Sequence, residues 1–332
     1  MRFVKKQFLF LFLFTSSFVL ANGVPWEEGS YFIKKSRINL EKTKKLFTKL
    51  EKDNGKNHQG LDYFGGVHSP FLEERLHASD VFLDTTRKQI FGSYNFAGAP
   101  KKGAIQLVKL NFDEVYINSE IIFSDSDINT IYKSGDRLYF AGSDAKGAFF
   151  SYALIRKDKF IKLGPKGYLP GYVATDIFQV RDRVLVSTGD NSGLHSIYND
   201  MTETDWSYDI FDSRSVYTSE KDRRIYVLSG QPAKIYHLNR NGQYLDSFEI
   251  GGAQTPESKS SLIKVDDLFY ATVGETGLKV VCEDKVVATL DSVKLPGVDP
   301  ALTVTGGVAV NGNLVFTANG EAGLYMYKRT EK

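Results

Sequence analysis

Six stretches of this chain carry a short side chain at the same place, where an alternating apolar segment begins. The aligned residues are Asp80, Asn129, Asp176, Ser215, Ser261 and Gly307. If these positions face one axis, a ring of carboxylate, amide and hydroxyl oxygens could hold a hard cation such as calcium, or orient a polar ligand. The alternative is structural, because Asp, Asn and Ser at a strand start commonly hydrogen-bond to nearby backbone groups.

Charged and polar residues close to this ring complete a candidate site at the mouth of a channel. We predict that the ligand-binding residues are His77, Asp80, Asp127, Asn129, Asp176 and Arg214. Among them, Asp80, Asn129 and Asp176 are the candidate calcium ligands. The same face should carry His68, Glu73, Glu74, Arg75, Asp125, Asp144, Tyr172, Asp190, Asn191, Lys259, Glu275, Asp299 and Glu321. No residue is assigned a catalytic role, because a histidine without a located partner is usually structural.

The elements that would position these residues form a repeat. A strand rich in Leu, Tyr, Phe and Val recurs six times, and its second residues are Ile90, Leu138, Val184, Ile225, Leu268 and Leu314. Their spacings are 48, 46, 41, 43 and 46 residues. A period in the forties, with about four short strands in each unit, is typical of propeller blades. Because one such sheet cannot cover both of its apolar faces, the blades must stack around an axis. The sequence thus predicts an all-β, single β-propeller of six four-stranded blades.

The sixth repeat lacks a fourth strand, since only five residues follow Gly323–Tyr327. An unpaired third strand would be an exposed edge. We therefore predict that Leu61–Val67 pairs antiparallel with it and closes the ring. The alternatives are an irregular loop at Leu61–Val67, or closure by Ser30–Lys34. Deleting residues 22–57 should then be tolerated, whereas deleting through Val67 should open the ring.

The N-terminus has the pattern of a secretory signal peptide. Arg2, Lys5 and Lys6 precede the apolar run Phe8–Phe14, and Val19–Ala21 supplies a cleavage site after Ala21. The apolar run is too short to span a bilayer, which takes about 20 residues. We expect a protein that is secreted or periplasmic, with no transmembrane segment after cleavage.

Between the signal peptide and the repeats, Arg37–Lys52 has the pattern of a short amphipathic helix. Its apolar stripe is narrow, so a packing cap or spacer is favoured over a membrane-surface role, despite its lysines. The predicted division of the chain is a signal peptide over residues 1–21, an N-terminal extension with this helix over residues 22–57, and the propeller over residues 58–332.

Composition and motifs exclude several classes of function. The 42 basic and 40 acidic residues nearly balance, which gives no broad basic field for nucleic acid. The single cysteine, Cys282, stands in an alternating stretch, so no intramolecular disulfide can form and a strand role is favoured over a reactive thiol. The sequence has no G-x-S-x-G, H-E-x-x-H or P-loop motif, no sialidase-type Asp box and no WD40 signature.

The last repeat, Gly307–Gly320 continuing through Gly323–Tyr327, resembles the LVIVD repeat of bacterial exported β-propellers. Gly193-Leu194 and Glu275–Val280 match that repeat in part, whereas the second and fourth repeats depart from it. The resemblance covers about residues 77–329. It implies a propeller fold and an extracytoplasmic location, and it implies no common activity.

These observations favour a non-catalytic propeller that acts as a binding or interaction scaffold through its loop face. Its partner would be a protein or a small polar ligand, with no cofactor. The alternative is a calcium-dependent hydrolase of the six-bladed lactonase kind, whose central ion Asp80, Asn129 and Asp176 would hold. The aligned ring lacks the Glu ligand that this class would be expected to have.

Overall fold

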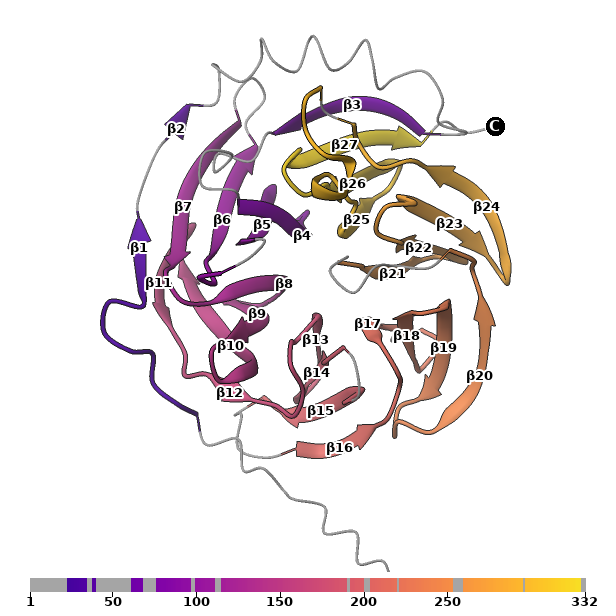
Figure 1. Ribbon diagram of the computed structural model, residues 1–332, viewed down its shortest axis with the longest axis horizontal. Coiled ribbons are helices and arrows are strands. Elements are labelled where there is room, and N and C mark those ends of the chain that lie inside the picture. The colour runs from indigo at the N-terminus through magenta and orange to yellow at the C-terminus, as the bar shows by residue number, and fades with distance from the viewer. Residues whose placement is uncertain are drawn as a thin grey trace, which may run out of the picture.

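The structure is a computed structural model that describes residues 23–34, 38–39, 61–67, 76–96, 99–110, 115–189, 192–199, 204–219, 221–252, 259–294 and 296–329. These residues form six antiparallel sheets arranged around a central axis (Figure 1). The chain is therefore a six-bladed β-propeller, and the predicted all-β fold class is confirmed.

Blades 1 to 3 follow one another along the chain, each with its first strand nearest the axis (Figure 1). Blade 1 consists of β4 (Leu76–Asp84), β5 (Gln89–Phe96), β6 (Gly103–Leu110) and β7 (Val115–Phe123). Blade 2 consists of β8 (Asp127–Ser134), β9 (Arg137–Asp144), β10 (Gly147–Arg156) and β11 (Lys159–Leu163), with β12 (Gly167–Tyr168) also paired to β10. Blade 3 consists of β13 (Asp176–Val180), β14 (Arg183–Ser187), β15 (Leu194–Tyr198) and β16 (Thr204–Tyr208).

Blades 4 to 6 complete the ring. Blade 4 consists of β17 (Ser213–Ser219), β18 (Arg224–Gly230), β19 (Ala233–Asn239) and β20 (Tyr244–Glu249). Blade 5 consists of β21 (Leu262–Val265), β22 (Leu268–Thr272), β23 (Leu278–Cys282) and β24 (Lys285–Leu290). Blade 6 consists of β25 (Gly307–Asn311), β26 (Leu314–Ala318), β27 (Leu324–Arg329) and β3 (Leu61–Val67). A short 3-10 helix, η3 (Pro300–Leu302), lies between blades 5 and 6.

The ring closes as predicted. Strand β3 pairs antiparallel with β27, from Val67 opposite Leu324 to Leu61 opposite Arg329. Blade 6 is thus built from both ends of the propeller sequence, and β3 forms its outer strand (Figure 1). The backbone groups of β27, which would otherwise form an open edge, are used in this pairing.

The N-terminal extension adds two short strands to the outside of blade 1 (Figure 1). Strand β1 (Tyr31–Lys34) pairs with β7, and so does β2 (Ile38–Asn39). The prediction of a helix over Arg37–Lys52 is wrong at its start, because the edge of β7 offers backbone donors and acceptors that an extended segment can use. The rest of that predicted helix, and the predicted signal peptide, lie outside the described residues. The alternative closing segment, Ser30–Lys34, belongs to blade 1 instead.

Alternate residues of each second strand pack against opposite neighbours. In β5, Ile90 packs with Phe316 of blade 6, whereas the adjacent Phe91 packs with Leu138 and Phe140 of blade 2. Since successive side chains of a strand point to opposite faces, both faces of every blade are apolar and are buried by the next blade. The core is therefore a series of six interblade layers.

Trp26, in the extension, is inserted at the rim of the layer between blades 1 and 2. Its half-buried ring lies 5.2 Å from the ring of Phe123 and 5.7 Å from that of Phe149, measured between centroids. Its indole nitrogen donates a 2.9 Å hydrogen bond to the carbonyl of Gly164. The segment before β1 is therefore part of the packed structure, which the sequence did not predict.

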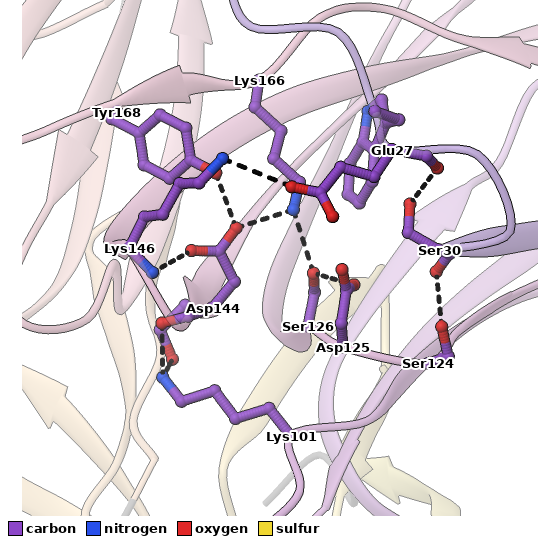
Figure 2. Close-up of polar contacts among 12 residues, drawn as sticks. Glu27, Ser30, Lys101, Ser124, Asp125, Ser126, Asp144, Lys146, Lys166 and Tyr168 are labelled. Carbon is purple, nitrogen blue, oxygen red and sulfur yellow. Dashed lines mark hydrogen bonds and ion pairs between the residues drawn. The ribbon is translucent and has the colours of Figure 1, made fainter.

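Trp26 also covers a buried cation. The ammonium of Lys166 lies 4.0 Å from the centroid of the indole ring and only 2.7 Å from the Asp144 carboxylate (Figure 2). Tyr168 donates a second hydrogen bond to the same carboxylate oxygen. Although burial acts to raise the pKa of Asp144, the hydrogen bonds from Lys166 and Tyr168 hold it below its ordinary value. A buried ion pair of this kind depends on every group around it, because an unpaired buried charge is strongly destabilising.

Candidate functional site

The inner strands of blades 1 to 5 are joined by a chain of buried hydrogen bonds around the axis. Thr130 of blade 2 lies between two carboxylates, with its hydroxyl oxygen 3.0 Å from Asp80 Oδ2 and 2.6 Å from Asp176 Oδ1. Asp176 in turn accepts hydrogen bonds from the hydroxyl and neighbouring amide of blade 4, at Ser215 and Val216. The Ser215 hydroxyl then accepts a 2.8 Å hydrogen bond from the amide of Leu262 in blade 5. We call Asp80, Thr130, Asp176 and Ser215 the axial belt.

The belt corrects one position of the predicted ring. Strand β8 shifts register between Ile128 and Thr130. Thr130 therefore pairs with Ala141 of β9, which corresponds to Ser93 of β5, the partner of Asp80. Asn129 is the extra residue of this bulge and occupies a different level along the axis. A bulge places two residues of one strand opposite one of its neighbour, which changes the facing of everything beyond it. Strand β4 has the same bulge, with Ser79 as its extra residue, so Ser79 is the counterpart of Asn129 and Asp80 is the counterpart of Thr130.

The belt also raises the pKa values of its two carboxyl groups. The Thr130 hydroxyl has one hydrogen but contacts two carboxylates, so it donates to one and accepts from the other. Burial and the nearby charge of Asp176 raise the pKa of Asp80 to about 8, whereas burial raises that of Asp176 to about 6. Burial therefore favours a proton on the Asp80–Asp176 pair, which meets at the Thr130 hydroxyl.

Of the three predicted calcium ligands, Asp80 and Asp176 meet at the Thr130 hydroxyl, whereas Asn129 lines the cavity on the other side of the belt. Each oxygen of Asp80 accepts a backbone amide hydrogen, from Val81 at 2.7 Å and from Ile131 at 3.0 Å. The amide group of Asn129 hydrogen-bonds to Asn95 and to the carbonyl of Ala174. These side chains are already engaged in hydrogen bonds, most of which join neighbouring blades. Among the described residues, no group of three or more His, Cys, Asp or Glu side chains is arranged to hold a metal.

Above the belt, at the end of the axis where the predicted loop face lies, the structure has a cavity of about 780 Å³. We call it the mouth cavity. Four of the six predicted ligand-binding residues line it: His77, Asp127, Asn129 and Arg214. The other two, Asp80 and Asp176, line a separate space of about 280 Å³ on the other side of the belt. The prediction that all six share one site is therefore wrong for this pair, because their carboxylates belong to the belt.

The space lined by Asp80 and Asp176 has an aromatic wall, whereas the mouth cavity is polar. Its wall contains Phe82, Tyr132, Phe178 and Tyr217, one from each of blades 1 to 4. Neighbouring rings are in contact, with centroids 5.3, 4.2 and 5.2 Å apart in that order. The polar side chains that could recognise a charged or hydrogen-bonding ligand are thus concentrated in the mouth cavity.

Two of the predicted residues in the mouth cavity contact carboxylates. His77 Nε2 lies 3.3 Å from a carboxylate oxygen of Glu321, a contact that joins blade 1 to blade 6. Arg214, which is the extra residue of a bulge at the start of β17, donates from Nε to Asp212 at 2.5 Å. Both side chains line the cavity, and both are oriented by a neighbour.

Two opposite charges share the mouth cavity without pairing to each other. Burial raises the pKa of Asp127 to about 6, although Lys259, Lys101 and the backbone amides of Phe96 and Lys102 act to lower it. Burial lowers the pKa of Lys259 to about 8, and attraction to Asp127 opposes that change. Asp127 Oδ1 is buried without a hydrogen-bond partner among the described residues. Within the described residues, Lys259 forms no hydrogen bond or ion pair. The sequence predicted Lys259 only as a residue of the loop face.

The sequence did not point to Lys101 and Ser143. The Lys101 ammonium donates to the Ser143 hydroxyl at 2.6 Å and to the carbonyl of Asp144 at 3.2 Å. A serine beside a lysine can form a nucleophile and base, but here the ammonium also donates to a backbone carbonyl, and Ser143 is buried. The pair therefore connects the β5–β6 loop to blade 2. No motif signals it, because the two residues are distant in sequence.

The rim of the cavity carries an exposed aromatic ring. Tyr172, in the connection between blades 2 and 3, is 73% exposed and lies 5.6 Å from the Lys101 ammonium. Glu275 and Lys259 also line the cavity, as their predicted place on the loop face requires. His68, Glu73, Glu74, Arg75, Asp190 and Asn191 lie outside the described residues.

The fold and the cavity together define a class: a six-bladed propeller with a charged, polar cavity at one end of its axis. In comparisons with known proteins, no family model matches the sequence, and no curated protein matches it. The resemblance to LVIVD-repeat propellers stays a prediction from the repeats. Within the described ranges, no helix has the length and apolar character needed to cross a bilayer.

Proposed function

We propose that this protein is an exported, non-catalytic binding propeller whose mouth cavity takes a small polar ligand with both an acidic and a basic group. The observation that carries the proposal is that Asp127, whose Oδ1 has no hydrogen-bond partner among the described residues, and Lys259 line one cavity without pairing to each other. An ammonium or other donor of the ligand would satisfy Asp127 Oδ1, and a carboxylate or other acceptor would satisfy Lys259. Export rests on the signal-peptide pattern alone.

The dimensions and lining of the cavity support this proposal. Its volume of about 780 Å³ lies in the range of small-molecule sites, about 300–1,000 Å³. The side chains around it are positioned in advance, since Asn95 and Asn129 hydrogen-bond to each other and Arg214 is fixed by Asp212. Pre-positioned polar groups reduce the entropy lost on binding. Tyr172 offers an exposed apolar surface beside them.

No specific observation favours the calcium-dependent hydrolase. Its expected ligands are divided between the axial belt and the mouth cavity, and those of the belt are engaged in interblade hydrogen bonds. The binding proposal needs neither a metal nor an activated nucleophile.

The proposal is tested by calorimetric titration and thermal melting of the protein with matched small molecules. The panel contains 6-aminohexanoate, hexanoate, hexylammonium and calcium chloride, so that each charge and the metal are separate arms. We expect 6-aminohexanoate to bind and to raise the melting temperature, because a ligand of the native state stabilises it. Equal binding of the singly charged compounds, or a response to calcium alone, would contradict the proposal.

Variants connect the binding to the two charges. Asp127→Asn and Lys259→Gln should each weaken binding of 6-aminohexanoate by about tenfold or more, since each removes one charge-assisted hydrogen bond. The matched controls are Asp284→Asn and Lys285→Gln, which remove the same charges from exposed positions at the end of blade 5. If the controls weaken binding as much as the cavity variants do, the ligand is responding to net charge and the cavity is not its site.

A further inference from the structure

A second cavity lies between blades 3 and 4, at the opposite end of the propeller from the mouth cavity. It measures about 230 Å³, which is the volume of several water molecules at about 30 Å³ each. Its polar rim comes from the turns β13–β14, β17–β18 and β19–β20, whereas the mouth cavity is lined by connections at the other ends of the strands. We call it the interblade cavity.

The cavity exists where blade 3 departs from the packing of the other blades. Leu185, Ser196 and Trp206 lie opposite one another on β14, β15 and β16, and all three line the cavity. The residues of the other third strands that correspond to Ser196, each facing the following blade, are Leu107, Tyr152, His237, Val280 and Met326. All are larger than serine. Blade 3 thus has a small hydroxyl residue where every other blade fills the layer.

The large residue is instead one strand further out. Trp206 lies on the outer strand, where blades 1, 4 and 5 have Ser119, Asp246 and Ala288 at the paired position. The exchange places an indole N–H and a hydroxyl between two blades. A layer that needed only apolar packing would gain nothing from these polar atoms, because burying them without partners costs about 1–3 kcal/mol each.

Three of the polar atoms around the cavity are buried and lack a hydrogen-bond partner within the described chain. They are Ser196 Oγ, Trp206 Nε1 and Arg183 Nε. Indole and guanidinium nitrogens can only donate, and the hydroxyl can donate as well. Arg183 is held in place by a 2.7 Å ion pair to Asp205 and by the ring of Tyr198, and its Nε lies 3.9 Å from Asp182 Oδ1, which is too far for a hydrogen bond. The unsatisfied groups therefore call for an acceptor.

The charge around the cavity specifies what that acceptor should be. The cavity is lined by one carboxylate, Asp182, and by four arginines. The arginines are Arg181, Arg183, Arg224 and Arg240. Asp182 is largely exposed, with 72% of its side chain accessible. Arginine side chains hydrogen-bond to oxyanions through several N–H groups in a fixed plane, which suits phosphate, sulfate and carboxylate.

We propose that the interblade cavity is a binding site for a tetrahedral oxyanion of the phosphate or sulfate type, free or at the end of a larger ligand. The anion would accept hydrogen bonds from Ser196, Trp206 and Arg183 on the blade 3 side. Arg224 would neutralise its charge from the blade 4 side. This site does not depend on the function proposed for the mouth cavity.

The test uses the intact protein and its own fluorescence. The chain has two tryptophans, and only Trp206 lines the cavity, since Trp26 packs between blades 1 and 2. Sodium phosphate and sodium sulfate are titrated against sodium chloride at equal ionic strength, and tryptophan emission is followed. We expect a saturable change with phosphate or sulfate that chloride does not produce. A response identical for all three salts would overturn the proposal.

Three variants separate a binding role from a structural one. Ser196→Ala and Arg224→Gln should each weaken anion binding by about tenfold, the effect of losing one charge-assisted hydrogen bond. The control is Arg137→Gln, because Arg137 begins the second strand of blade 2 as Arg224 begins that of blade 4, and it lies on the ring of Tyr152. It should bind like the wild type. Equal weakening in all three variants would indicate a general charge effect and refute the site.

Melting without added anion gives the second readout. Ser196→Ala removes a buried hydroxyl that has no partner in the described chain, so its melting temperature should equal or exceed that of the wild type. In phosphate, the wild type should gain more than the variant, because a ligand stabilises the state that binds it. A variant that melts lower than the wild type in chloride would show that Ser196 Oγ serves the fold instead of an anion.

Discussion

Replacing Trp26 by alanine should destabilise the whole propeller, although the residue precedes the first blade. A fully buried Trp→Ala change costs about 3–5 kcal/mol, and Trp26 is half-buried, so we assign about 2 kcal/mol to lost packing. Losing the ring face 4.0 Å from the Lys166 ammonium adds about 1–2 kcal/mol. The indole hydrogen bond to Gly164 adds about 1 kcal/mol.

Because these contributions overlap, we expect a total loss of about 3–4 kcal/mol, which lowers the melting temperature by about 6–12 °C in a domain of this size. The assay is chemical denaturation followed by circular dichroism. Phe32→Ala is the matched control: Phe32 lies on β1 of the same extension, is 54% exposed, and should change stability by less than about 0.5 kcal/mol.

A double-mutant cycle isolates the cation. Lys166→Met should couple to Trp26→Ala by about 1–2 kcal/mol, since each residue loses its partner when the other is changed. Trp26→Ala with the stability of the wild type, or a coupling near zero, would refute the view that the extension is a packed part of the fold.

Three further outcomes follow from the structure. Deleting residues 22–57, which the sequence suggested would be tolerated, should destabilise at least as much as Trp26→Ala in the same denaturation assay; equal stability of deletion and wild type would contradict this. Deleting through Val67 should also remove β3 and leave an insoluble chain, checked by solubility and circular dichroism. The folded-state pKa of Asp80, about 8, is above its unfolded value near 3.8, so its contribution to stability is complete below about pH 4 and is lost as the pH rises through 8. Asp80→Asn should flatten that part of the pH profile while costing about 1–3 kcal/mol, because an amide nitrogen facing the Ile131 N–H cannot accept its hydrogen bond; an unchanged slope would refute the raised pKa of Asp80.

Binding at the mouth cavity should have a bell-shaped dependence on pH. With the pKa of Asp127 at about 6 and that of Lys259 at about 8, both groups are charged between these values. Calorimetric affinity for 6-aminohexanoate should therefore be greatest near pH 7 and fall on either side. Affinity that is flat from pH 5 to pH 9 would separate the binding from these two groups.

The blades and their closure could be predicted from sequence because each depends on local patterns. Alternation set the strands, the period set the blade count, and the missing fourth strand required Leu61–Val67 to complete blade 6. Asn129 was aligned with Asp80 although its counterpart is Ser79, because the turn after the inner strand is longer in blade 1, where Asp84 pairs with Gln89, than in blade 2, where Ser134 pairs with Arg137. His77, Asp127 and Arg214 were correctly placed at the mouth cavity because each lies at or next to the first residue of an inner strand, where the connections between blades meet.

Contacts between distant residues could not be predicted. Trp26 and Lys166 are 140 positions apart and meet only because the extension follows the outside of blades 1 and 2. In the sequence, Ser196 and Trp206 are only a small and a large residue on neighbouring predicted strands. Only the packing of blade 3 against blade 4 shows that they leave polar atoms around a cavity.

The joint between β3 and β27 also orders events during folding. Val67 and Leu324 pair although they are 257 residues apart in the sequence. The entropy of closing so long a loop must be lost before the pairing stabilises anything, whereas hairpins within a blade form from neighbouring residues. On a ribosome, β3 emerges early and has no partner until Leu324–Arg329 has been made. Blades 1 to 5 can therefore assemble first, and the pairing that completes blade 6 is the step that turns an open arc into a ring.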